Sequence, residues 1–203
     1  MRDLFRIRAF AHGREKMFQR TRDYAKDYEK IGSTIRYKGK HYRFTIEQPA
    51  LNRRKAAYVL SLAFALLLFL AVGLSDSPAL GAGGGAGAIY VLLPYVVLLL
   101  PLGLGLARAL LTALKSAPME YAEYDKYMVQ QKMVILFGLA LSGVLLLGEL
   151  LFLLFGGQEI APQWPAIAET AACAACIFIA FRQYHALFEA IAIDEAKSVR
   201  YDI

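Results

Sequence analysis

Four long runs of apolar residues set the strongest constraint on the fold. They cover residues 56–74, 88–107, 133–155 and 165–181. Each run approaches the ~20 residues that a helix needs to cross the hydrocarbon core of a bilayer. The runs are continuous blocks, whereas the strands of a membrane β-barrel alternate over about ten residues. The chain is therefore predicted to be an all-α integral membrane protein with four transmembrane helices.

Lysine and arginine are distributed unevenly among the connecting segments. Residues 1–55 contain 16 of the 23 Lys and Arg residues and only six acidic residues, and the remaining basic residues lie in 108–132 or follow the fourth run. The connections 75–87 and 156–164 contain none. Because basic residues favour the cytoplasmic side, both termini and the 108–132 connection are predicted to be cytoplasmic (N-in/C-in).

The same topology accounts for the formal net charge of +6, so nucleic-acid binding is not predicted. The first apolar run begins only at Ala56, which predicts no cleavable signal peptide. With such short outer loops, the bacterial inner membrane is the expected location. The expected partners are anionic lipid headgroups and either a second copy of the chain or another membrane protein.

The chain divides into a basic N-terminal region (1–55), a four-helix membrane domain (56–182) and a cytoplasmic tail (183–203). The N-terminal region is predicted to contain a helix over 14–31 and a β-hairpin over 33–46. Within the membrane domain, the connection between the second and third runs is predicted to form an amphipathic cytoplasmic helix. That helix covers 116–132 and is capped by Ser116.

The hairpin is predicted to turn at Gly39 and Lys40, because Gly suits the first central position of a type II′ turn. This register pairs Tyr37 with Tyr42 on an apolar face and leaves the other face basic. A basic face can bind anionic headgroups, at about 1 kcal/mol per Lys or Arg near the surface; the alternative is a solvated positive flank. The candidate lipid-binding residues are Arg36, Lys38, Lys40, His41, Arg43, Arg53, Arg54 and Lys55.

Two glutamates lie inside the predicted spans, Glu149 in the third and Glu169 in the fourth. At 1.5 Å per residue, both lie roughly 6–7 Å beyond the middle of their spans toward the outer side. Tyr95 of the second span has a compatible depth and is a candidate hydrogen-bond donor to them. Desolvation and mutual repulsion disfavour ionisation of both, so at least one is expected to carry a proton. The pair predicts a proton or cation site; the alternative is a polar contact between helices.

Each glutamate lies on a helical face that also carries small residues. Small residues let membrane helices approach closely. The two faces are therefore expected to pack on each other or on another subunit. Their other members are Gly138 and Ser142 in the third span, and Cys173, Cys176 and Ala180 in the fourth.

No arrangement of residues typical of catalysis is present, so no cofactor, metal or enzymatic activity is predicted. The three histidines are scattered and lack metal-ligand spacing. Cys173 and Cys176 have the spacing of a redox pair, but they lie near the middle of a span, where a thiolate is strongly disfavoured. A membrane thiol oxidoreductase is consequently the least favoured alternative.

Two functional hypotheses remain. The first is a non-enzymatic polytopic membrane protein that acts by association, as a homo-oligomer or as an accessory or regulatory subunit of a membrane complex. It depends on the small-residue faces and on the absence of catalytic residues. The alternative is a small proton- or cation-coupled transporter or channel that uses the intramembrane glutamate pair.

Overall fold

The computed structural model describes residues 28–31, 34–37, 39–75, 77–81, 87–115, 118–155 and 163–193. The chain divides into two compact units. The larger unit comprises Phe44–Ala117 and Asp125–Ile191. The smaller unit comprises the N-terminal region to Arg43, Pro118–Tyr124, and the chain from Ala192 onward. The two units are described separately.

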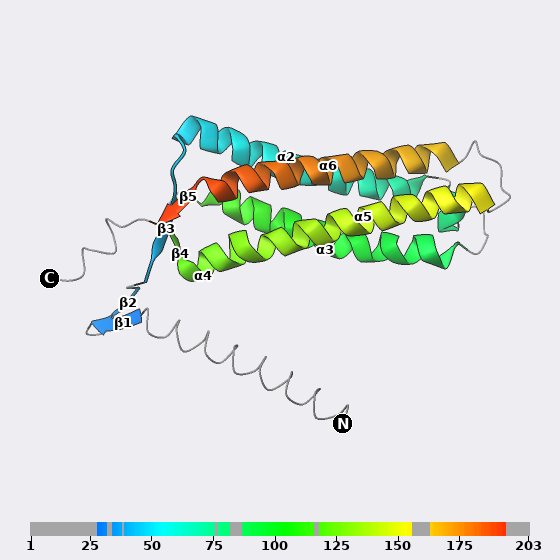
Figure 1. Cartoon of the computed structure of the whole chain (residues 1–203). Helices are drawn as coiled ribbons and strands as arrows, with labels where there is room; N and C mark the ends of the chain where they lie inside the picture. Colours follow the sequence, from blue (N-terminus) through cyan, green and yellow to red (C-terminus); the bar gives the residue numbers. More distant parts are fainter. Residues whose placement is uncertain are drawn as a thin grey trace, which may run out of the picture. The chain divides into compact units, whose positions relative to one another are not determined.

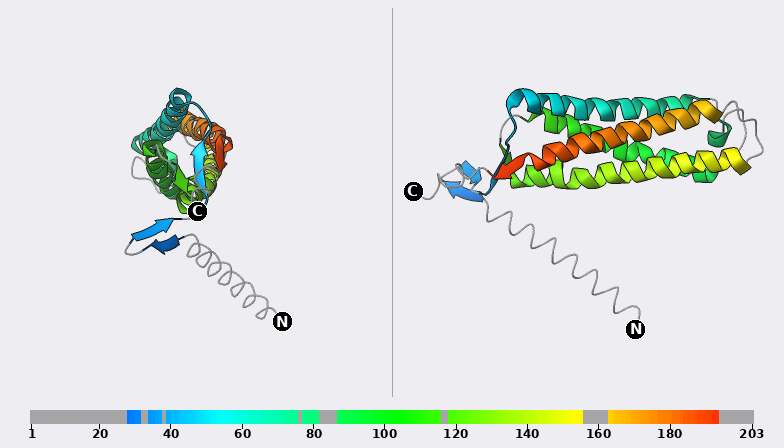
Figure 2. Two further views of the ribbon diagram at one scale, coloured as in Figure 1. Left: turned by 90° about the vertical axis from the view of Figure 1, so that its left-hand side faces the viewer. Right: turned by 45° about the horizontal axis from the view of Figure 1, so that its top comes forward.

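The larger unit is a bundle of four helices (Figure 1). They are α2 (Gln48–Leu74), α3 (Ile89–Leu114), α5 (Gln130–Phe155) and α6 (Trp164–Glu189). α2 packs against α3 and α6, and α5 packs against the same two helices, so all four surround one core (Figure 2). Each helix is long and apolar enough to cross a membrane. The prediction of a mostly helical chain with four helices long and apolar enough to span a membrane is confirmed.

Each helix buries one side and leaves apolar side chains on the other. In α2, Tyr58, Leu62 and Ala65 are buried, whereas Leu60 and Phe64 are exposed. A water-soluble helix would place polar residues on the exposed side. An exposed side that remains apolar is typical of a helix surrounded by lipid, where the backbone hydrogen bonds are satisfied within the helix.

The helix ends agree with simple local chemistry. Pro49 and Pro165 lie in the first turns of α2 and α6, where a missing backbone N–H costs nothing. After α2, the short 3₁₀ helix η1 (Pro78–Leu80) ends at Gly81, whose φ of 92° favours glycine. α3 continues through Pro94 and Pro101, both of which are buried.

The segment before α5 differs from the predicted amphipathic helix over 116–132. Met119–Glu120 is a strand, β4, followed by α4 (Tyr121–Tyr124) and the π-helix η3 (Asp125–Val129). The helical segment therefore starts at Tyr121 and runs without a break into α5, ending at Phe155. The reason is that Met119 and Glu120 pair with another strand, and tertiary pairing overrides helix propensity.

The smaller unit contains two strand pairings that differ from the predicted hairpin over 33–46. Strand β1 (Tyr28–Ile31) pairs with β2 (Thr34–Tyr37), so Tyr37 lies opposite Tyr28 instead of Tyr42. In the sequence these strands are separated by Gly32 and Ser33, a Gly-first dipeptide like Gly39–Lys40. Residues 28–31 are also extended, in contrast to the predicted helix over 14–31; residues 14–27 lie outside the described part.

Strand β3 (His41–Phe44) lies between β4 and β5 (Ile191–Ile193). Tyr42 lies opposite Met119 in the antiparallel pairing with β4. The Tyr42 ring stacks on Tyr124 with a centroid distance of 4.1 Å and an interplanar angle of 5°. This segment therefore pairs with a distant part of the chain and not with its own sequence neighbour.

Candidate functional site

Glu149 lies inside the bundle, between α5 and α6. Its side chain is fully buried. Its Oε1 accepts a hydrogen bond of 3.0 Å from the Oγ1 of Thr170 on α6. Its Oε2 has no hydrogen-bond partner among the described residues. One carboxylate oxygen is thus held in place, while the other remains able to bind a proton or cation.

Glu169 precedes Thr170 on α6 and is half-buried. Its Oε2 is also buried without a hydrogen-bond partner in the described part of the chain. Glu169 is therefore next in sequence to the residue that binds Glu149. Because an unpaired charge is costly in a low-dielectric interior, the buried oxygen of Glu149 favours a bound proton or cation.

Tyr95 does not contact the glutamates. Its hydroxyl donates to the carbonyl oxygen of Phe69 at 3.4 Å, and its ring stacks on the Phe69 ring with a centroid distance of 4.5 Å. Gly73 makes this contact possible, because a Cβ atom there would collide with the Tyr95 hydroxyl. In the structure Tyr95 thus joins α3 to α2, whereas its position in the sequence predicted a donor to Glu149 and Glu169.

Two of the predicted small-residue positions, Gly138 and Cys173, contact other helices of the same chain. Gly138 faces α3, with its Cβ position 3.5 Å from the Cβ of Pro101. Cys173 Sγ donates to the carbonyl oxygen of Ala65 on α2 at 3.2 Å. Ser142 Oγ donates to the carbonyl oxygen of Leu139 within its own helix at 2.8 Å. Ala180 is fully buried and Cys176 is half-buried.

A polar network at the opposite end of the bundle was not identified from the sequence. The Nε2 of Gln131 donates to the Tyr58 hydroxyl at 2.5 Å and to the Gly105 carbonyl oxygen at 3.0 Å. The Tyr184 hydroxyl donates to the carbonyl oxygen of Met128 at 2.5 Å. These bonds connect α2, α3 and α5, and tie α6 to the turn before α5. The sequence did contain one signal for this network, because Gln131 shares a helical face with Gly138 and Ser142, which are buried.

Lys55 is a candidate lipid-binding residue by its sequence position, but its ammonium group is used within the protein. The side chain is buried. Its Nζ donates to the carbonyl oxygen of Lys115 at 2.5 Å and lies 4.8 Å from the centroid of the Phe44 ring. This carbonyl and ring provide the hydrogen bond and cation–π contact that a buried ammonium requires.

The other candidate lipid residues fall into two groups. Arg53 is exposed and Arg54 half-buried at the start of α2, in the larger unit. In the smaller unit, Lys40 and Arg43 are exposed and His41 is half-buried. Arg36 lies in β2 opposite Glu29. Lys38 lies outside the described residues.

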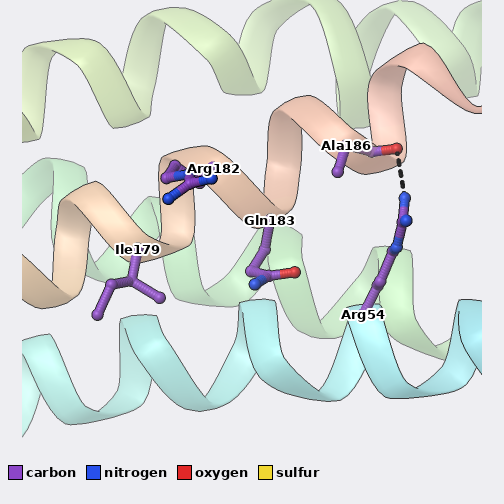
Figure 3. A pocket seen from close by; sticks show the side chains of 5 residues that line it. All are labelled: Arg54, Ile179, Arg182, Gln183 and Ala186. Atoms are coloured by element: carbon purple, nitrogen blue, oxygen red, sulfur yellow. Dashed lines mark hydrogen bonds between the residues drawn. The ribbon is translucent and has the colours of Figure 1, made fainter.

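The two arginines of α2 border a groove that runs between α2 and α6 (Figure 3). It consists of two adjoining hollows of about 330 and 410 Å³, which share Arg54 and Gln183. Arg182 of α6 lines the smaller hollow and was not among the predicted lipid-binding residues. Arg54 Nη1 donates across the groove to the carbonyl oxygen of Ala186 at 3.2 Å.

A second groove, of about 450 Å³, lies on the outward side of α5. Gly143 is exposed there, and a Cβ atom at its position would meet nothing within 4 Å. Small residues on an exposed helix face permit a second helix to approach closely. The lining residues are Tyr90, Ala140, Gly143, Val144, Leu147, Gly148 and Leu151.

No group of three or more His, Cys, Asp and Glu residues with the arrangement of a metal site occurs in the part of the chain that the structure describes. No family model, curated protein or solved structure matches the chain. The fold and the sites above describe a bundle of four helices, each apolar enough to cross a membrane, with the buried carboxyl group of Glu149 toward one end and a basic groove toward the other.

Proposed function

We propose that the protein acts by association in the membrane, as a homo-oligomer or as an accessory subunit of a membrane complex. The observation that carries this proposal is the outward groove of α5. The small-residue faces predicted from the sequence are occupied within the chain, so the proposed contact uses another face. The distribution of Lys and Arg supports an orientation with both termini in the cytoplasm, and the short outer loops support the bacterial inner membrane as the location.

The lining of this groove suits a helix as its occupant. Ala140, Gly143, Val144 and Leu147 recur at spacings of three and four residues, so they lie along one side of α5. Membrane helices associate mainly through close van der Waals packing, because lipid tails are as apolar as the helices themselves. A groove with glycine at its floor increases this contact by admitting the side chains of a neighbouring helix.

Gly143→Leu is expected to abolish the association, because the new side chain would fill the groove. The matched control is Gly103→Leu, which introduces the same change at an exposed glycine of α3 with nothing within 4 Å. Native mass spectrometry of protein extracted gently from its source membrane measures the result. The wild type and the control should retain the same copies or partner, and the Gly143→Leu variant should be monomeric.

An unchanged assembly in the Gly143→Leu variant would exclude the α5 groove as the contact. A monomeric wild type in the source membrane would remove the association hypothesis. The composition of a retained complex distinguishes a homo-oligomer from an accessory subunit.

The carboxyl pair favours a second candidate function, proton- or cation-coupled transport. Ionisable groups within a membrane bundle often mark ion or proton pathways. Glu149 and Glu169 each retain a buried oxygen without a hydrogen-bond partner among the described residues. Thr170 supplies a hydroxyl oxygen beside them, and oxygen atoms are the ligands that hard cations prefer.

Glu149→Gln is expected to reduce such transport at least tenfold, because an amide cannot exchange a proton and carries no charge for a cation. The amide oxygen can still accept the hydrogen bond from Thr170, so the fold should be preserved. Flux would be followed in vesicles with a pH-sensitive dye, under a proton gradient and then under a sodium gradient. The matched control is Glu189→Gln, at an exposed glutamate near the other end of α6. Flux in the Glu149→Gln variant equal to that of the wild type would rule out this function.

A further inference from the structure

We propose that the groove between α2 and α6 is a binding site for one anionic glycerophospholipid, whose phosphate is held by Arg54 and Arg182. This inference goes beyond association or transport, since it assigns a ligand to a surface used by neither. Basic pockets between membrane helices commonly bind anionic lipid headgroups. Three features of the groove support the assignment: its charge, its position along the helices and its apolar wall.

All of the charged residues that line the groove are positively charged. Arg53, Arg54 and Arg182 contribute guanidinium groups and Gln183 an amide, with no acidic residue in either hollow. A guanidinium group binds phosphate oxygens through two parallel hydrogen bonds, which makes arginine well suited to phosphate recognition. Both helices thus contribute guanidinium groups to the lining; Figure 3 shows Arg54 reaching from α2 to the carbonyl oxygen of Ala186, and Arg182 on α6.

The arginines lie where the apolar part of each helix ends. Arg53 and Arg54 come shortly before the apolar stretch that starts at Ala56, and Arg182 directly follows Phe181. α2 begins at the end of the bundle where α6 finishes (Figure 1), so the backbone positions of the three arginines lie near the same end of the bundle. In a membrane-spanning bundle this depth corresponds to the layer of lipid phosphates.

The wall of the groove is apolar on the side toward the middle of the bundle. Ile179 lines the smaller hollow and is 48% exposed, and Phe178 beside it is 50% exposed. An acyl chain attached to the bound headgroup can pack along this surface. A soluble phosphate would gain nothing from it, so the groove as a whole matches a lipid.

Arg54 is held in the groove before any ligand binds. Its bond to Ala186 uses a carbonyl group of the last turn of α6, which has no partner within the helix. The other N–H groups of the guanidinium remain available for a ligand. Fixing a long side chain in advance lowers the entropy lost on binding, which favours a specific site over diffuse attraction by a positive surface.

Arg182→Gln is expected to reduce retention of phosphatidylglycerol at least tenfold, without a change in phosphatidylcholine retention. The purified full-length protein would be equilibrated in mixed micelles of the two lipids, and bound lipid would be counted by native mass spectrometry. Arg182→Lys should give an intermediate result, because it keeps the charge and loses the two-pronged hydrogen bonding. Lys132→Gln is the matched control, since Lys132 is an exposed basic residue at the same end of the bundle, outside the groove.

Equal losses in the Arg182→Gln and Lys132→Gln variants would overturn the proposal in favour of diffuse electrostatic attraction. Equal retention of the two lipids by the wild type would also overturn it. Displacement of phosphatidylglycerol by the same concentration of soluble glycerol phosphate would assign the site to a free phosphate compound. These results are independent of the association state, which the Gly143→Leu variant tests.

Discussion

Gly138→Leu is expected to destabilise the four-helix bundle, whereas Gly143→Leu is expected to leave its stability unchanged or slightly higher. The Cβ position of Gly138 is 3.5 Å from the Cβ of Pro101, and Pro101 is a rigid, buried ring within α3. A leucine side chain cannot fit there unless α3 and α5 move apart. Overpacking of this kind costs about 1–3 kcal/mol.

The comparison between two glycines of one helix isolates the packing cost. Both substitutions increase helix propensity by a similar amount, about 1 kcal/mol, but only Gly138 faces a neighbouring helix. Thermal unfolding can be followed with a thiol-reactive fluorophore in a Cys176→Ala background, which removes the half-buried cysteine. The remaining Cys173 is 2% exposed and reacts only once the bundle opens. A detergent that keeps all variants monomeric separates this effect from assembly. Equal midpoints for the two variants would contradict the packing described for α3 and α5.

Gln131→Ala is expected to lower the free energy of unfolding by about 1–3 kcal/mol, the cost of leaving a buried polar group without its partner. The substitution removes the donor that binds both the Tyr58 hydroxyl and the Gly105 carbonyl oxygen. Gln131 is 1% exposed, so water does not readily replace the lost bonds.

A double-mutant cycle with Tyr58→Phe tests whether the bond between Gln131 and Tyr58 contributes to this loss. Interhelical hydrogen bonds in membrane proteins show coupling energies that average about 0.6 kcal/mol and reach about 1.7. The control is Gln130→Ala, because Gln130 is exposed and bonds only to Asp125 of the preceding turn in the described structure. Strict additivity of the two core substitutions would show that the network contributes no coupling. A loss in the Gln130→Ala variant as large as that in the Gln131→Ala variant would show that burial does not determine the effect.

The four membrane helices could be predicted from the sequence because continuous apolar runs of this length are a local signal that depends on no distant partner. The strand pairing could not be predicted in this way, because it depends on distant partners. Gly32–Ser33 and Gly39–Lys40 are both Gly-first dipeptides in the sequence, whereas in the structure Tyr42 lies opposite Met119, which is distant in the sequence. Local turn chemistry contains no information about that partner.

The candidate sites show the same division between local and long-range information. Helical rise and rotation per residue were sufficient to predict similar depths for Glu149 and Glu169, and in the structure Glu149 bonds to Thr170, the residue next to Glu169. The depth of Tyr95 along its helix was not sufficient to predict its hydrogen-bond partner. That partner depends on the rotation of α3 against α2 and on the space at Gly73. From the basic composition of its segment, Lys55 was predicted to lie at the surface. In the structure, the packing of α2 directs its ammonium group to Lys115 and Phe44.

The π-helix η3 has a consequence for how the bundle is assembled. An α-helix bonds every interior carbonyl to the amide four residues later, and a π-turn shifts that pattern to five residues. Where the two patterns meet, the backbone offers an acceptor to a neighbouring helix. Tyr184 of α6 binds the carbonyl oxygen of Met128 within this turn. The alignment of α6 beside α5 therefore depends in part on a backbone carbonyl group. Deletion of a single residue from 125–129 is expected to remove this acceptor for Tyr184, although every core side chain of α5 would still be present in the sequence.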